Sequence, residues 1–171
     1  MRTGTGSPVG PRFRRWIGVL AAPLGLLLLA TSCSSNNTVS GGGVPTHAVF
    51  VQKFRYHGLP TTLSSGNQII DFSNRESLPI VHEMILLALP QGKTKQDVIN
   101  DAKAKGPDAE GDFTSFGEIG EVDTGSTKAQ TFDLPAGNYV IACFEQGNLG
   151  DPSAKGKVHA ARGMVFQFTV S

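Results

Sequence analysis

Short apolar segments separated by glycine and proline constrain this chain more than any other feature of its sequence. The strongest one covers residues 80–89, between Pro79 and Pro90, and its ten residues suit a buried strand better than a helix. Further strand-like segments cover residues 46–54, 67–72, 129–134, 137–144 and 163–170, and residues 113–122 are ambiguous. With 21 glycines, 10 prolines and 8% aromatic residues, the pattern predicts an all-β Greek-key sandwich or barrel of about seven short strands.

One segment departs from the strand pattern. Residues 94–105 change to a helical period, Thr94 can cap the start of the helix, and Asp97 follows three residues later. The pair Gly106 and Pro107 ends the segment. We therefore expect one short helix inserted between two strands.

The N-terminal 32 residues have the pattern of an export signal. Four arginines and no acidic residue precede an apolar stretch over residues 17–30. Its 14 residues fall short of the roughly 20 that span a bilayer, so a secretory signal is the better interpretation. Small residues then lead into Cys33, which resembles a bacterial lipobox, in which the cysteine is lipidated and becomes the first mature residue. An uncleaved anchor, or a cleaved signal that leaves Cys33 free, are the alternatives.

This interpretation divides the chain into a lipoprotein signal peptide over residues 1–32, a flexible tether over 33–43 and a folded domain over 44–171. The tether is rich in serine, asparagine and glycine. A lipid anchor on Cys33 predicts attachment to the outer, extracytoplasmic face of the cell membrane. The net charge of +1 gives no electrostatic reason to expect a nucleic acid partner.

Four side chains with an affinity for soft metal ions lie near predicted strand ends. His82 stands early in the apolar segment 80–89, Cys143 ends the segment 138–143, and His159 precedes Met164 by five positions. Each alone would be an ordinary core residue. An exported protein with an unpaired thiol needs a reason for it, because free thiols oxidise, and the reason is either metal ligation or deep burial.

The order of these residues resembles the cupredoxin family, which includes plastocyanin and azurin. Asn74 and His82 match the asparagine-containing turn that leads to the first histidine of that family. Residues 137–143 match the pattern G-x-Y-x-x-x-C, and residues 159–164 match H-x4-M. The resemblance covers residues 44–171 and implies a cupredoxin-like β-barrel that holds one type 1 copper ion.

The resemblance also implies a role for each residue. His82, Cys143 and His159 would be equatorial copper ligands, Met164 the weak axial ligand, and Asn74 the residue that ties the first-histidine turn to the cysteine loop. A thiolate with two imidazoles and a weak thioether suits both Cu(I) and Cu(II). We therefore expect a membrane-tethered copper protein that transfers electrons or handles copper, with a redox or copper-transfer protein as partner.

One feature departs from the family pattern. Fifteen residues, 144–158, separate Cys143 from His159, where the family has two to four. A metal-free cupredoxin-like binding or assembly module, or a site for zinc or another ion, are therefore the alternatives. No general acid–base pair stands out, so we do not expect an enzyme.

Overall fold

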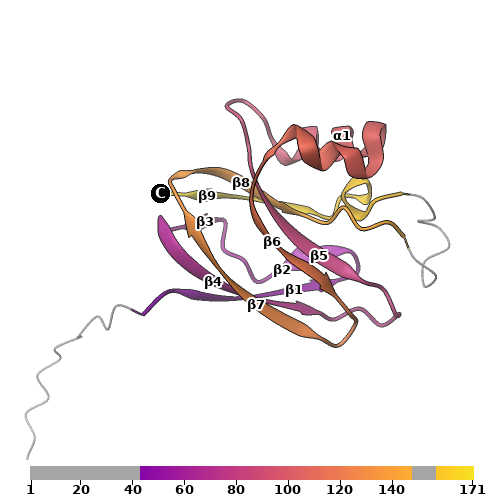
Figure 1. Ribbon diagram of the computed structural model, residues 1–171, viewed down its shortest axis with the longest axis horizontal. Helices are drawn as coiled ribbons and strands as arrows, with labels where there is room; N and C mark the ends of the chain where they lie inside the picture. The colour runs from indigo at the N-terminus through magenta and orange to yellow at the C-terminus, as the bar shows by residue number, and fades with distance from the viewer. Residues whose placement is uncertain (1–42, 148–156) are drawn as a thin grey trace, which may run out of the picture. The chain divides into compact units, whose positions relative to one another are not determined.

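Two β-sheets face each other and enclose the main core of the domain (Figure 1). The computed structural model describes residues 43–147 and 157–171, so the predicted signal peptide, Cys33 and the tether up to residue 42 lie outside the described residues. The strands are β1 (Thr46–Gln52), β2 (Arg55–His57), β3 (Thr62–Leu63), β4 (Gly66–Asn74), β5 (His82–Ala88), β6 (Thr114–Val122), β7 (Thr127–Leu134), β8 (Gly137–Ala142) and β9 (Val165–Val170).

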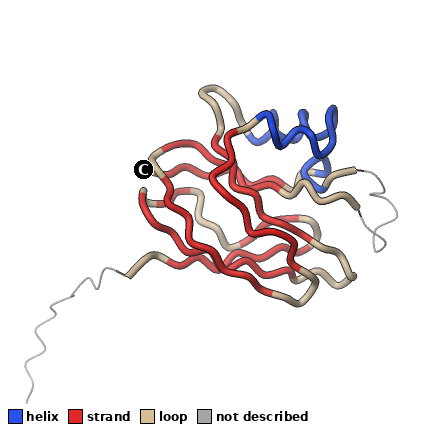
Figure 2. Tube along the Cα trace, viewed as in Figure 1, coloured by secondary structure: helices blue, strands red, loops and turns tan. Residues whose placement is uncertain are grey.

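The sheet topology confirms the predicted all-β class. One sheet has the order β2-β1-β4-β7 and the other β3-β9-β8-β5-β6. Strands β1 and β4 are parallel, as are β3 and β9, whereas the other neighbouring strands are antiparallel. Figure 2 shows the strands as two layers, with the helical segments gathered at one end of the sandwich.

After His82 and Glu83, strand β5 is entirely apolar because both of its faces are covered. Met84 and Leu86 point into the core between the sheets, whereas Ile85 and Leu87 belong to a second apolar cluster that includes residues of the helix α1. Successive side chains of a strand alternate between faces, so a strand with two buried faces shows no alternation in its sequence. This explains the uninterrupted apolar run at residues 84–89, within the segment 80–89.

The predicted helix forms as α1 (Lys95–Lys105), with Thr94 as its N-cap. The Thr94 hydroxyl accepts a hydrogen bond from the Gln96 N–H, and the Asp97 carboxylate accepts one from the Thr94 N–H at 2.9 Å. Gly106 ends the helix with φ of 64°, a conformation that glycine adopts without strain. A 3₁₀ helix, η1 (Gly106–Asp112), follows directly.

The strand predictions were wrong in two respects. Strands β2 and β3 were missed because three and two residues are too few to show an alternating pattern. The first strand was predicted to continue to Phe54, but it ends at Gln52, since Lys53 and Phe54 have φ of 53° and 57° and turn the chain. This turn places Phe54 beside the candidate site described below.

Within the two described ranges, no helix is both long and apolar enough to cross a bilayer.

Candidate metal centre

His82 is the first residue of β5, and its side chain is completely buried. The turn before it is fixed by the buried amide of Asn74, which donates hydrogen bonds to the carbonyl oxygens of Ile80 (2.7 Å) and Val122 (2.8 Å). The Asn74 side-chain oxygen accepts from the Glu76 N–H at 3.1 Å. These bonds join the turn to the end of β6, and none of those described for Asn74 reaches the cysteine loop.

Cys143 directly follows β8, where Tyr139 and Ile141 face the core between the sheets. Because side chains alternate along a strand, Cys143 faces the same core. Its thiol is free of any disulfide in the described domain, and the residue is completely buried.

His159 returns to Cys143 because the two ends of the long connection between them are hydrogen-bonded to each other. Gln146 and Val158 form an isolated β-bridge. Beyond it, the His159 N–H donates to the Glu145 carbonyl at 2.9 Å and the Ala160 N–H donates to the Cys143 carbonyl at 2.7 Å. His159 then begins a 3₁₀ helix, η3 (His159–Arg162), with its imidazole completely buried.

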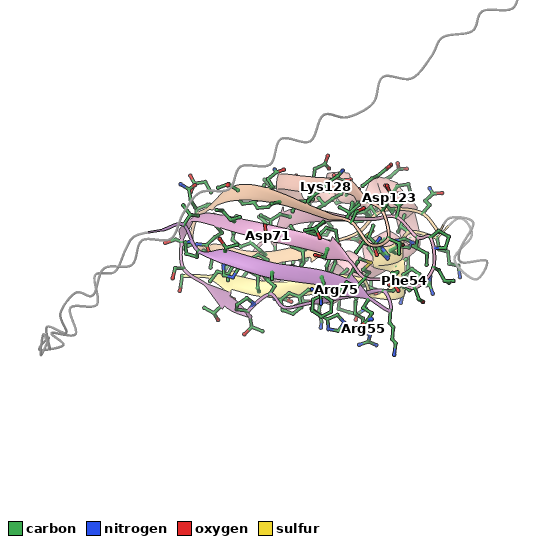
Figure 3. All side chains as sticks on the ribbon, turned by 90° about the horizontal axis from the view of Figure 1, so that it is seen from below. Phe54, Arg55, Asp71, Arg75, Asp123 and Lys128 are labelled. Atoms are coloured by element: carbon green, nitrogen blue, oxygen red, sulfur yellow. The ribbon has the colours of Figure 1, made fainter. Side chains whose placement is uncertain are left out.

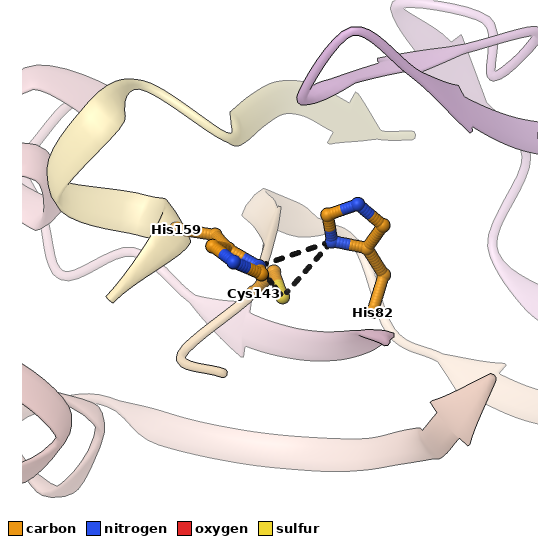
Figure 4. A group of neighbouring side chains, drawn as sticks. All are labelled: His82, Cys143 and His159. Atoms are coloured by element: carbon orange, nitrogen blue, oxygen red, sulfur yellow. Dashed lines mark hydrogen bonds between the residues drawn. The ribbon is translucent and has the colours of Figure 1, made fainter. Parts of the chain in front are cut away.

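Three of the predicted site residues therefore meet at one end of the sandwich (Figure 4). The Cys143 sulfur lies 3.3 Å from His159 Nδ1 and 3.8 Å from His82 Nδ1, and the two Nδ1 atoms are 3.1 Å apart. Two ligand atoms bound to one ion at about 2.0–2.3 Å lie roughly 3–4 Å apart. The three donor atoms thus have the separations that a shared metal ion requires.

Burial keeps the Cys143 thiol and the His82 imidazole neutral in the absence of a cation. Desolvation raises the pKa of the Cys143 thiol. Desolvation, together with a smaller effect of the positive charge of Arg162, lowers the pKa of His82 to about 4. A neutral imidazole is the form that binds metal, and a metal ion binds the thiolate by displacing the thiol proton.

Met164 is completely buried in the same apolar cluster as Cys143. Gly163, with φ of 94°, ends the 3₁₀ helix and turns the chain into Met164, whose N–H donates to the His159 carbonyl at 3.2 Å. The backbone thus holds Met164 close to a candidate ligand, one residue before β9.

Sequence reasoning missed Glu83, which joins the His82 strand to the cysteine loop. Its carboxylate accepts a 2.7 Å hydrogen bond from the Phe144 N–H, and its own carbonyl accepts one from the Tyr56 hydroxyl at 2.6 Å. Burial raises the pKa of Glu83 to about 7, against the lowering effect of the Phe144 hydrogen bond. The signal was present in the sequence, because Glu83 is the one acidic residue in the apolar segment 80–89.

Phe54 was also missed, and it covers both imidazoles. Its ring meets His82 and His159 edge-on, with centroid distances of 5.4 and 5.1 Å, and the Arg162 guanidinium stacks on it at 4.0 Å. The Phe54 N–H donates to Glu76 Oε1 at 2.7 Å. The same oxygen is 3.5 Å from His82 Nε2, without hydrogen-bond geometry, so it is an electrostatic neighbour of that imidazole.

The residues present fit a copper ion. The donor set is one sulfur and two imidazole nitrogens, which soft and borderline ions such as copper and zinc accept. Within the described ranges, this trio is the group of histidine, cysteine and acidic side chains whose ligand atoms lie within 4.8 Å of one another. A buried trio of this composition, with a methionine in the same cluster, is the arrangement of a type 1 copper site.

Fold and site together define a cupredoxin-like domain. A scan against protein-family models finds no match, and neither does a search of curated proteins. Among solved structures, an auracyanin from the photosynthetic bacterium Roseiflexus castenholzii shares 18% identity over 76% of this chain and 99% of its own length, with a TM-score of 0.53. This likeness shows the fold.

Two further structures are similar to a lesser degree. Auracyanin A from Chloroflexus aurantiacus, described as a "blue" copper protein, is 18% identical over 75% of this chain and all of its own, with a TM-score of 0.46. An azurin from Methylomonas sp. strain J is 14% identical over 75% of this chain and 98% of its own, with a TM-score of 0.45.

Proposed function

We propose that this protein binds one copper ion and transfers electrons or handles copper outside the cytoplasm. The observation that carries the proposal is the convergence of the buried Cys143 sulfur with the Nδ1 atoms of His82 and His159, within 3.1–3.8 Å. Cys143 and His159 are sixteen positions apart and His82 lies sixty-one positions before Cys143, so local chain geometry does not bring them together by default.

Each residue has a distinct part in this proposal. His82, Cys143 and His159 would hold the copper ion through two imidazole nitrogens and one sulfur, and the Met164 thioether would be a fourth, weaker ligand. When bound, copper supplies a one-electron couple between Cu(I) and Cu(II). The β-sheet strands and the Glu83–Phe144 hydrogen bond keep the donor atoms in place, so few atoms need to move when the charge of the site changes.

A metal titration of the full-length protein tests this function. Addition of Cu(II) should produce a blue charge-transfer band at a stoichiometry of about one copper per chain. Cys143→Ser should abolish the band, whereas Cys33→Ser is the matched control and should retain it. Metal analysis that finds no copper in the wild-type protein would refute the proposal and favour a metal-free binding module.

The axial role of Met164 needs a separate test. Met164→Leu conserves the volume of a buried side chain, so it should cost less than about 1.5 kcal/mol of stability. If the thioether is a ligand, the same substitution changes the absorption spectrum and the reduction potential of the copper form. An unchanged spectrum and potential would make Met164 a core residue only.

We further propose that lipid on Cys33 anchors the protein to the outer face of the membrane. The support is the sequence pattern of a basic segment, an apolar stretch and small residues before Cys33. Expressed in a bacterium, the wild-type protein should sediment with membranes, and Cys33→Ser should move it to the soluble extracytoplasmic fraction. A Cys33→Ser variant that still sediments with membranes would contradict the anchor.

A further inference from the structure

The arginines of the described domain gather at the end of the sandwich that holds the metal centre. Arg55, Arg75 and Arg162 are all the arginines in the described ranges, and all three are exposed. Exposed Lys53 lies two residues before Arg55, in the turn between β1 and β2. We call these four residues the basic patch. Figure 3 shows Arg55 and Arg75 beside Phe54 on one side of the domain, whereas Lys128 lies on the opposite side.

Aromatic rings hold two of these guanidinium groups in place. Arg162 stacks on Phe54 with 4.0 Å between the guanidinium carbon and the ring centroid, and Arg75 stacks on Phe50 at 4.2 Å. A stacked guanidinium keeps its charge and carries its N–H donors at its edge, where they suit carboxylates. Stacking on Phe50 therefore orders Arg75 without neutralising its charge.

Glu76, the acidic residue next to Arg75, does not present its carboxylate on the surface of the basic patch. Glu76 follows Arg75, but its side chain is only 8% exposed and its carboxylate accepts the Phe54 N–H. The Arg75 N–H itself donates to the Val51 carbonyl at 2.9 Å. These bonds turn the acid inward and leave the arginine side chain on the surface.

The basic patch lies around Phe54, the side chain that contacts both imidazoles of the metal centre. His82 and His159 are completely buried, so no partner touches the imidazoles directly. Phe54 is half-buried and contacts both of them. A partner that exchanges electrons or copper at this end of the domain meets Phe54 and the surrounding cations first.

We propose that the basic patch is the docking surface for a protein partner that presents clustered carboxylates. This inference rests on the proposed function, because the patch matters for electron or copper exchange only if the site beneath Phe54 holds the metal. Carboxylates form bidentate hydrogen bonds with arginine, and opposite charges accelerate encounter and fix orientation. A partner docked here would lie over Phe54, above His159.

The test is an NMR titration of the full-length protein with poly-L-glutamate as the carboxylate probe. Amide shifts should change most at residues 53–55, 75 and 162, and the apparent affinity should fall at least about fivefold between 20 and 200 mM NaCl. Arg55→Glu and Arg75→Glu should each weaken binding by about threefold or more. Lys128→Glu is the matched control and should change the affinity by less than about twofold.

Three results would overturn the docking surface. The first is a change of amide shifts that spreads over lysines outside the basic patch. The second is a loss of affinity in Lys128→Glu as large as that in Arg55→Glu and Arg75→Glu. Preferential binding to phosphatidylglycerol vesicles, lost in Arg55→Glu, would replace the protein partner by a membrane surface. The same spectra show whether each variant is folded. If Arg55→Glu is misfolded, Arg55→Gln is the milder substitution that replaces it.

Copper titration of the same variants separates this inference from the proposed function. Arg55 and Arg75 have no described contact with the donor residues, so their variants should bind copper with wild-type stoichiometry. If the wild-type protein binds no copper, the proposed function fails, whereas the poly-L-glutamate result still decides whether the patch binds carboxylates.

Discussion

Removal of the Glu83 carboxylate should loosen the cysteine loop. Glu83→Ala takes the acceptor from the Phe144 N–H, a 2.7 Å hydrogen bond, and Phe144 is only 4% exposed. A buried N–H without a partner costs about 1–3 kcal/mol, so the free energy of unfolding should fall by about that amount. Because Phe144 directly follows Cys143, the copper affinity should also fall, by about 10- to 100-fold, as is typical when residues that orient metal ligands are lost.

The matched variant is Glu83→Gln, which retains a side-chain oxygen that can accept the same hydrogen bond. We expect its stability to remain within about 1 kcal/mol of wild type. Urea denaturation of the copper-free protein measures the stability of both variants. Competition with a chelator of known affinity measures their copper binding.

The comparison between Glu83→Ala and Glu83→Gln decides whether the hydrogen bond or the charge of Glu83 stabilises the cysteine loop. Equal losses of stability and copper affinity in Glu83→Ala and Glu83→Gln would show that the carboxylate charge, and not the hydrogen bond, matters. A loss below about 0.5 kcal/mol in Glu83→Ala would show that the cysteine loop is held by its other contacts.

Three further predictions address the fold and the metal. Gly163→Ala should cost about 1 kcal/mol or more, measured by urea denaturation, because Gly163 has φ of 94°, and no loss would contradict a strict need for glycine. Hydrogen bonds from Thr94 lower the pKa of Asp97 in the folded protein. The ionised carboxylate therefore contributes fully to the free energy of unfolding above the pKa of the unfolded chain, about 4, and this contribution is lost as the pH falls through the lower pKa of the folded protein. The stability gap between wild type and Asp97→Asn should therefore close on acidification, and a constant gap would refute this. Copper at about 100 times its Kd should add about 2.7 kcal/mol to the free energy of unfolding, seen as a higher Tm, and Cys143→Ser should lose that gain.

Much of the sandwich could be predicted because its strands carry clear physical signals. The apolar run at residues 80–89 became β5, buried on both faces, and Thr94 and Asp97 capped the helix as the sequence indicated. The turn at Phe54 could not be predicted, since neither Lys53 nor Phe54 is a residue type that favours positive φ. That turn is what brings an aromatic ring over the imidazoles.

The candidate site was partly visible in the sequence, because the residue types and their order near strand ends indicated a metal centre. The structure brings together His82, Cys143 and His159, and it adds Glu83 and Phe54. Glu83 was overlooked because its apolar neighbours indicated a buried strand, although a single acidic residue among them was itself a signal. The contacts of Asn74 depend on which carbonyls the fold brings to its amide, and no pattern of residue types reveals that.

The long connection between Cys143 and His159 shows why spacing alone misjudges such a site. Lengthening a loop costs little entropy, about 0.6 kcal/mol for each doubling, so fifteen residues are no obstacle by themselves. What matters is whether the ends of the loop are fixed, and here the Gln146–Val158 bridge and the bonds from His159 to Glu145 and from Ala160 to Cys143 fix them. All of these bonds lie at the base of the connection, next to the donor atoms. The position of His159 therefore depends on this short paired segment and not on the number of residues beyond it, which is why an unusually long connection is compatible with a tightly packed trio of donors.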